Sequence, residues 1–315
     1  MVAKQSDFAF DYVTEVFDSV MVVQGDCFEW LQKVPAASIH AIVTDPPYGV
    51  KEYELDQLAK KDNGSGGIWR LPPAFDGSTR SPLPRFTALS SSEIQILKEY
   101  FTRWSQLVTR VLVPGAHVFV SSNAYLSQSV FNSIVNGGLE FRGEIIRLVR
   151  TMRGGDRPKN AEAEFPDVCT LPRGAYEPWG VFRKPIPSKM TVSECLKIYK
   201  TGGLRRRSDG TPFNDVINST RTPNNEKKIA PHPSLKPQAF LRQIVSAALP
   251  LGEGIVLDPF MGSGSTIAAA KVLGYEGIGI ERREEYFKMS VEAIPKLAGL
   301  NPQDDPIEQL NLFDS

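Results

Sequence analysis

The sequence predicts a single α/β domain built on a doubly wound, mostly parallel, Rossmann-like sheet with helices on both faces. Strand-like runs alternate with amphipathic helical runs through most of the 315 residues. Two strand-like runs, 40–44 and 254–260, carry an acidic residue to the end of a strand, a placement typical of nucleoside-binding sheets. With 41% hydrophobic and 23% charged residues, the chain has the composition of a folded protein with a sizeable core.

The amino-terminal half predicts strands and helices in turn. Short β-branched runs indicate strands, and apolar residues at helical spacing with glycine stops indicate helices. Strands are expected at 20–24, 40–44, 117–121, 141–150 and 176–184, and helices at 27–34, 91–112 and 123–138.

The carboxyl-terminal half predicts a complete βαβ unit. Strand 254–260 is followed by helix 263–274, which stops at Gly274, and by strand 275–281, which ends at Glu281. An amphipathic helix at 236–249 precedes this unit, and another at 284–300 follows it. We therefore expect helices on both faces of the sheet.

Three segments do not fit the alternating pattern. Residues 49–90, rich in glycine and proline, predict a long mobile loop directly after the strand that ends at Asp45. Residues 185–231 are basic and irregular, and residues 301–315 predict a flexible tail. Long loops in a compact domain usually carry function, so the first two are candidates for substrate contact.

Composition excludes some classes of protein. No run approaches 18 apolar residues, and Lys4, Asp7 and Asp11 interrupt the start of the chain, so we expect a soluble cytoplasmic protein without membrane contact. The chain has three cysteines and three histidines, far apart, which predict neither disulfides nor a zinc site: Cys27, Cys169, Cys195, His40, His117 and His232.

The zero net charge conceals an uneven distribution. Residues 1–60 hold four basic against ten acidic residues, whereas residues 183–207 hold eight basic residues against Glu194 alone. A polyanion could dock on the basic stretch, although solvated helix faces explain such counts equally well.

The turn after strand 254–260 predicts a nucleoside site. Asp258 ends the strand, Gly262 and Gly264 form a Gly-x-Gly turn into a helix, and Glu281 lies where an acid could accept ribose hydroxyl groups. No lysine follows Gly264 and Ile267 stands where a dinucleotide fold has its third glycine, so ATP and NAD are disfavoured.

The turn after strand 40–44 predicts an amine pocket. In Asp45-Pro46-Pro47-Tyr48, two prolines fix the backbone and remove two N–H donors, so carbonyl and carboxylate oxygens can face one point beside an aromatic ring. Such a pocket suits a planar group with an NH₂ to donate, as on a nucleobase. A simple packing turn is the alternative.

Together these motifs resemble the amino-methylating DNA methyltransferases that use S-adenosylmethionine. The chain carries DPPY at 45–48, HPSLKP at 232–237 and DPFMGSGST at 258–266, with the cofactor motif after the catalytic one, which is similar to the circularly permuted β group of that family. Weaker likeness extends over most of residues 20–290. The loops at 49–90 and 185–231 fall outside this likeness, and in this family the second of these two positions is where target recognition usually lies.

The resemblance implies a role for each matched residue. Asp45 and Pro46, with Pro47, would hold the target amino group and Tyr48 would stack on the flipped base. The cofactor would contact Asp258, Pro259, Phe260, Gly262, Ser263, Gly264, Ser265 and Thr266, with Glu281 at its ribose, Asp26 at its adenine end, and His232 and Lys236 closing over it. Where the family commonly has threonine, this chain has Ser265, which keeps a hydroxyl. Candidates for DNA contact are Arg205, Arg206, Arg207 and Arg221, with a solvated loop as the alternative.

The expected reaction is methylation of adenine N6 in duplex DNA, because family members with aspartate at the first motif position more often act on adenine. Cytosine N4 is the alternative, since the pocket accepts either amine. RNA or protein-glutamine methyltransferases more often begin this motif with asparagine, an oxidoreductase should bind NAD, and a catalytically silent DNA-binding module should survive loss of Asp45. The resemblance also implies a prokaryotic or phage-type protein, with a homodimer and a cognate restriction endonuclease as expected partners.

Overall fold

The computed structural model describes residues 8–47, 69–70, 83–84, 89–153, 161, 163–169, 172 and 174–301. Its strands are β1 (Val13–Phe17), β2 (Val20–Gln24), β3 (Ile39–Thr44), β4 (Trp69–Arg70), β5 (Leu83–Pro84), β6 (Leu112–Ser121), β7 (Glu140–Arg153), β8 (Gly174–Arg183), β9 (Val216–Asn218), β10 (Ile255–Asp258) and β11 (Glu276–Glu281). Its helices are α1 (Cys27–Lys33), α3 (Ser91–Val111), α4 (Ser127–Asn136), α5 (Val192–Tyr199), α6 (Asn224–Ile229), α7 (Gln238–Ala248), α8 (Ser265–Val272) and α9 (Glu284–Ala298).

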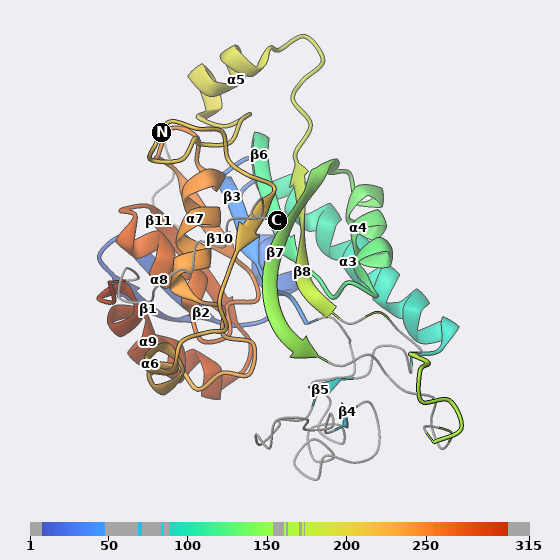
Figure 1. Ribbon diagram of the computed structural model, residues 1–315. Helices are drawn as coiled ribbons and strands as arrows, with labels where there is room; N and C mark the ends of the chain where they lie inside the picture. Colours follow the sequence, from blue (N-terminus) through green and yellow to red (C-terminus); the bar gives the residue numbers. More distant parts are fainter. Residues whose placement is uncertain are drawn as a thin grey trace.

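The main sheet has nine strands in the order β1-β2-β11-β10-β3-β6-β8-β7-β9 (Figure 1). Strands β2, β11, β10, β3 and β6 run parallel to their neighbours in this series. Strand β1 pairs antiparallel with β2, and β8 lies antiparallel between β6 and β7. The predicted doubly wound, mostly parallel sheet is confirmed, and the permuted order is visible where β2 lies beside β11.

Helices cover both faces of this sheet. Helices α1, α3 and α4 pack on one face, where their buried side chains include Trp30, Phe101 and Phe131. Helices α7, α8 and α9 pack on the other, burying residues such as Phe240 and Ile294. Neighbouring residues of each strand point to opposite faces, so both faces of the central strands are apolar and need this double cover.

The basic segment 185–231 contains more regular structure than the sequence predicted. Helix α5 begins at a capping box in which Thr191 and Glu194 exchange hydrogen bonds, and β9 extends the sheet by pairing with β7. Strand β1 also lay outside the predicted strands. These short elements carry too little apolar patterning to be recognised, and they form here because caps and neighbouring strands complete them.

The same segment divides between the two edges of the sheet. The turn after α5 packs at the amino ends of the strands, where Gly202 N donates to Gly115 O at 3.0 Å and Thr201 Oγ1 donates to Pro114 O at 2.6 Å. Strand β9 then returns the chain along β7 towards the carboxyl ends (Figure 1). The predicted loop at 49–90 and the predicted tail at 301–315 fall almost entirely outside the described residues.

No helix in the described ranges combines the length and hydrophobicity needed to cross a membrane. The described cysteines are unpaired: Cys27 and Cys195 are buried and Cys169 is exposed. Among the described residues, no group of three or more His, Cys, Asp or Glu side chains could hold a metal ion.

A glycine in β11 seats the loop that follows β10. A Cβ on Gly279 would overlap the sulfur of Met261 and lie 2.8 Å from Cγ1 of Ile267. Met261 is buried, and its N–H donates to Ile280 O at 3.0 Å. Residue 279 must therefore lack a side chain for the loop to rest on the strand.

We expect Gly279→Ala to lower the free energy of unfolding by about 1–3 kcal/mol, because the added methyl overpacks the core beneath this loop. Gly174→Ala is the matched control, since a Cβ there meets no atom within 4 Å, and it should change stability by less than about 0.5 kcal/mol. Thermal unfolding of both variants measures the difference, and equal melting temperatures would contradict the packing argument.

Candidate active site

Parallel pairing brings both sequence motifs to one edge of the sheet. Strand β10 lies between β3 and β11, with Leu257 opposite Ile42 and Asp258 opposite Gly279. Because parallel strands end at the same edge, Asp45 after β3 and Asp258 at the end of β10 lie side by side. One cavity is lined by Asp45, Trp179, His232, Ser234, Lys236, Leu241, Asp258, Phe260, Met261, Gly262, Ser263, Ser265 and Thr266. Asp45 and the glycine turn therefore share a cavity.

A hydrogen bond joins the two strand ends directly. Thr44 Oγ1 donates to Asp258 Oδ1 at 2.7 Å, and the Phe260 N–H donates to the same oxygen at 3.2 Å. Burial raises the pKa of the Asp258 carboxyl to about 6, although the hydrogen bonds from Thr44 and Thr266 oppose this rise. Asp258 is thus a buried acid whose carboxyl loses its proton at a higher pH than a solvated aspartate does.

The glycine turn is braced from β11. Gly262 and Gly264 have positive φ angles of 55° and 85°, which L side chains rarely adopt, and α8 begins directly after Gly264. Glu281 Oε2 accepts from Gly262 N at 2.9 Å, and its Oε1 accepts from Arg283 N at 2.7 Å. Burial raises the pKa of Glu281. Glu281 therefore shapes the turn, a contact that the sequence did not indicate.

Asp26 lies beside Glu281. Its carboxylate caps α1 by accepting from Phe28 N at 2.8 Å, and the Gly25 N–H donates to Glu281 O at 3.0 Å. Arg282 Nη1 lies 4.0 Å from Asp26 Oδ2. Asp26 and Glu281 thus stand together next to the cavity, beyond the glycine turn.

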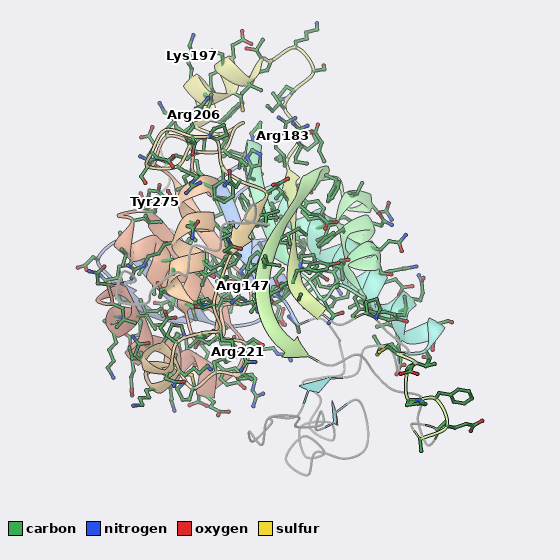
Figure 2. The ribbon with its side chains drawn as sticks, in the orientation of Figure 1. Arg147, Arg183, Lys197, Arg206, Arg221 and Tyr275 are labelled. Carbon is green, nitrogen blue, oxygen red and sulfur yellow. The ribbon has the colours of Figure 1, made fainter. Side chains whose placement is uncertain are left out.

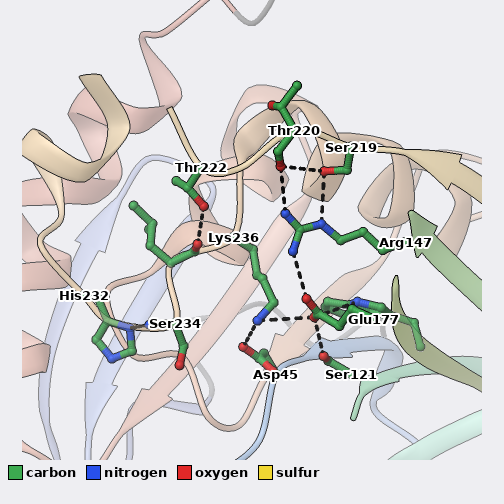
Figure 3. Close-up of polar contacts among 12 residues, drawn as sticks. Asp45, Ser121, Arg147, Glu177, Ser219, Thr220, Thr222, His232, Ser234 and Lys236 are labelled. Carbon is green, nitrogen blue, oxygen red and sulfur yellow. Dashed lines mark hydrogen bonds and ion pairs between the residues drawn. The ribbon is translucent and has the colours of Figure 1, made fainter. Parts of the chain in front are cut away.

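The diproline corner faces a buried lysine. Pro46 is buried and Pro47 is half-buried, while Tyr48 lies outside the described residues. Lys236 Nζ forms an ion pair with Asp45 Oδ2 and lies 3.3 Å from Glu177 Oε1 (Figure 3). The sequence matched Lys236 to a cofactor-closing segment and gave no role to Glu177, whose place in the middle of β8 has no motif to mark it.

The HPSLKP segment is fixed against the glycine turn. The ring of His232 packs edge-to-face on Tyr286, with 4.4 Å between ring centroids, and a Cβ on Gly262 would lie 3.1 Å from its Cε1. Directly after this segment, the Gln238 N–H donates to the buried carboxylate of Glu226 at 3.0 Å. His232 and Lys236 are therefore held over the cavity by α6, α7 and α9.

The structure separates the four arginines proposed for DNA contact. Arg205 Nη1 donates to Tyr275 Oη at 2.8 Å and its N–H donates to Ala247 O, which places it at the amino end of β11. Glu281 is the last of the six residues of β11, so it lies roughly 20 Å from this end. Arg206 and Arg207 follow on the same side, so the run at 205–207 is not part of the candidate site. A run of like charges does not reveal on which edge of the sheet it will fold.

Arg221 lies at the other edge. It is exposed, and its neighbours both contact the site: Thr220 O accepts from Arg147 Nη2 at 3.1 Å and Thr222 Oγ1 donates to Leu235 O at 2.5 Å. Figure 2 shows Arg206 in the upper part of the molecule and Arg221 in the lower half. Of the four arginines, Arg221 alone is placed near the cavity.

Comparisons with known proteins agree with this geometry. A family model for N6/N4 methyltransferases, described as DNA methylase, matches residues 39–292. The Type II methyltransferase M.HindIII of Haemophilus influenzae is 26% identical over 297 residues, covering 87% of this chain and 94% of the relative.

Two solved structures share the fold at low identity. One is a putative DNA modification methylase of Thermus thermophilus in complex with S-adenosyl-L-methionine, with a TM-score of 0.55, 18% identity, and 88% and 93% of the two chains covered. The other is the PvuII DNA methyltransferase, described as cytosine-N4-specific, with a TM-score of 0.57, 15% identity, and 91% and 88% coverage. Since the family model spans most of the sequence and both of its motifs border one cavity, this chain belongs to the DNA methylase family of N6 and N4 amino-methyltransferases.

Proposed function

We propose that this protein transfers a methyl group from S-adenosylmethionine to the exocyclic N6 of an adenine flipped out of duplex DNA. The observation that carries the proposal is the shared cavity, in which Asp45 after β3 faces the glycine turn after β10. An acceptor for an amine and a site for a methyl donor are thus adjacent.

The residues around the glycine turn fit S-adenosylmethionine. The buried Asp258 carboxylate suits the ammonium group of the methionine part, and the turn through Gly262 and Gly264 permits close backbone approach. Glu281 and Asp26 offer carboxylates for the ribose and the adenine end. The Thermus thermophilus relative was solved with this cofactor, which supports the assignment. When bound, S-adenosylmethionine supplies a methyl group on a positively charged sulfur.

The diproline corner would prepare the amine for attack. The Asp45 carboxylate and the Pro46 carbonyl would accept its two hydrogens, which localises the nitrogen lone pair and directs it at the methyl carbon. The new N–C bond would replace the C–S bond of the methyl donor, whose electron pair would stay on sulfur, and Asp45 would take the proton that the nitrogen releases and pass it to water. Stacking on Tyr48 would return about 1–3 kcal/mol of the unstacking energy.

Adenine is favoured over cytosine by the aspartate at position 45, following the usage of the family. The cytosine-N4-specific PvuII enzyme shares this fold, which keeps N4 methylation as the second candidate. The relative from Haemophilus influenzae is named a Type II methyltransferase, which supports the idea of a companion restriction endonuclease. We further propose a single catalytic domain in which target contact comes from the part of the 185–231 segment that returns with β9.

Incubation of the protein with methyl-labelled S-adenosylmethionine and duplex DNA tests the proposal. We expect label in DNA, and nucleoside analysis should identify the product as N6-methyladenine. N4-methylcytosine would establish the second candidate instead, and label in RNA or protein but not in DNA would refute both.

Asp45→Ala is expected to abolish transfer while cofactor affinity stays within a few fold, because Asp45 acts on the amine and not on the cofactor. Equilibrium binding of S-adenosylmethionine, measured by calorimetry beside the transfer assay, separates the two effects. Transfer at the rate of the unchanged protein would refute the pocket assignment.

Cofactor binding should depend on pH through Asp258. Because the pKa of this carboxyl is raised to about 6, it is ionised at pH 7 and mostly protonated at pH 5, where it no longer attracts an ammonium group. We expect the Kd for S-adenosylmethionine to rise about tenfold from pH 7 to pH 5. The Asp258→Asn variant should bind S-adenosylmethionine weakly at both pH values, so its affinity should change little with pH. If the affinity of the variant fell as steeply between pH 7 and pH 5, another group would be responsible for the pH dependence.

Arg221→Ala should weaken DNA binding at all sequences and reduce the slope of log affinity against log salt by about 1, as loss of one phosphate contact does. Arg206→Ala is the matched control, since it removes an arginine of the same basic segment at the opposite edge of the sheet. Fluorescence anisotropy over a salt series compares the two. A larger effect of Arg206→Ala would place the DNA at the amino edge.

A further inference from the structure

Four charged side chains form one cluster, of which two, Asp45 and Lys236, line the cavity (Figure 3). Lys236 and Asp45 come from loops, Glu177 from β8 and Arg147 from β7. The exposed fractions of their side chains are 11%, 15%, 21% and 6%, so all four are largely withdrawn from water. Two carboxylates and two cations balance one another, and the Lys236 ammonium lies between the two acids.

The ion pair between Lys236 and Asp45 conflicts with the role of Asp45 in the proposed reaction. Asp45 would have to accept a hydrogen from the target amine, yet Lys236 Nζ occupies its Oδ2. A fixed positive charge there would also repel the positive charge that develops on the attacking nitrogen. Both oxygens of Asp45 are therefore available to the amine only if Lys236 turns to another acceptor when the base enters.

Glu177 is the acceptor within reach. Its Oε1 is 3.3 Å from Lys236 Nζ and accepts from Ser121 Oγ at 2.7 Å and from Trp179 Nε1 at 3.1 Å. Its Oε2 accepts from Arg147 Nη1 at 2.9 Å. The carboxylate is thus held in place by three strands of the sheet, β6, β7 and β8.

Arg147 is itself fixed. Its Nε donates to Ser219 Oγ at 3.0 Å, its Nη2 donates to Thr220 O at 3.1 Å, and its guanidinium lies over the ring of Phe240, 5.0 Å from the centroid. Arg147 can therefore hold Glu177 in place whether or not Lys236 changes its partner. The three donors on Glu177 leave it rigid, as a preorganised acceptor should be.

Both partners stay charged over the working range of pH. Burial alone would raise the pKa of Glu177, but Lys236 and Arg147 outweigh it and lower the value to about 2. Burial opposes the charge on Lys236, yet Asp45 and Glu177 raise its pKa. Moving the ammonium from one carboxylate to the other thus needs no proton transfer.

We propose that Glu177 is a positioning residue for methyl transfer, which takes the Lys236 ammonium when the target amine engages Asp45. The role in methyl transfer rests on the proposed function. The physical claim beneath it is that either carboxylate alone can hold the buried ammonium, and this claim can be tested on the protein without substrate.

A thermal double-variant cycle tests that physical claim without any activity. Asp45→Asn leaves Lys236 with Glu177, and Glu177→Gln leaves it with Asp45, so each single change keeps one ion pair. The double variant leaves a buried ammonium with no carboxylate partner among the described residues, and we expect its melting temperature to fall by roughly 5 °C or more beyond the sum of the single shifts. The lost Arg147 contact is common to both variants that carry Glu177→Gln, so it cancels in the cycle.

Glu140→Gln is the control for this cycle. Glu140 pairs with Arg183 at 2.6 Å on the same sheet, without contact to Lys236, so its combination with Asp45→Asn should be additive within about 1 °C. Additive shifts for Asp45→Asn with Glu177→Gln would overturn the proposal. Should Glu177→Gln not accumulate, Glu177→Asp, which withdraws the carboxylate by one methylene, takes its place.

A kinetic double-variant cycle tests whether Glu177 acts on methyl transfer through Lys236. In single-turnover transfer to DNA, Glu177→Gln should slow the methylation step at least tenfold while the Kd values for cofactor and DNA stay within about threefold. In a Lys236→Met background the same change should alter the rate less than twofold, because Glu177 acts through the lysine. Equal slowing in both backgrounds would show a merely structural role and overturn the proposal.

Absence of transfer by the unchanged protein would refute the proposed function, while the thermal cycle still decides the claim about Glu177.

Discussion

Parallel pairing of β3 with β10 is the constraint on which the site depends. The two strands are more than two hundred residues apart in sequence, and their pairing alone brings the diproline corner beside the glycine turn. The hydrogen bond from Thr44 to Asp258 closes this junction at its end. Because both strands are buried on both faces, a slip in register would expose apolar residues and separate the two acids, so packing fixes the geometry of the site.

The antiparallel part of the sheet supports the same site from the other side. Strands β7 and β8 contribute Arg147 and Glu177, and β6 contributes Ser121, so a buried charge cluster rests on backbone that the sheet holds rigid. Buried charges cost desolvation energy unless each is paired, and the alternation of cations and anions around Lys236 meets this condition. The arrangement is a weak source of stability but a precise way to orient an acceptor.

Periodicity and motif spacing predicted most of the fold and the core of the site. The strands β2, β3, β10 and β11 and the helices between them were expected close to their observed bounds, because β-branched runs, helical spacing of apolar residues and glycine stops are local signals. Glu177 was not predicted, since its importance arises from strands that pair only in three dimensions. Arg205–Arg207 were predicted on the strength of charge alone, and charge does not encode which end of a strand a loop will reach.

The position of β2 in the sheet has a consequence for folding during synthesis of the chain. Its parallel partner β11 is synthesised about 250 residues later, and its other neighbour is only the short edge strand β1. At about 5–20 residues per second, the ribosome needs roughly 10–50 s to supply that partner. The nascent chain therefore carries β2 without its parallel partner while about 250 residues are added, and the sheet is completed only after β11 has left the ribosome.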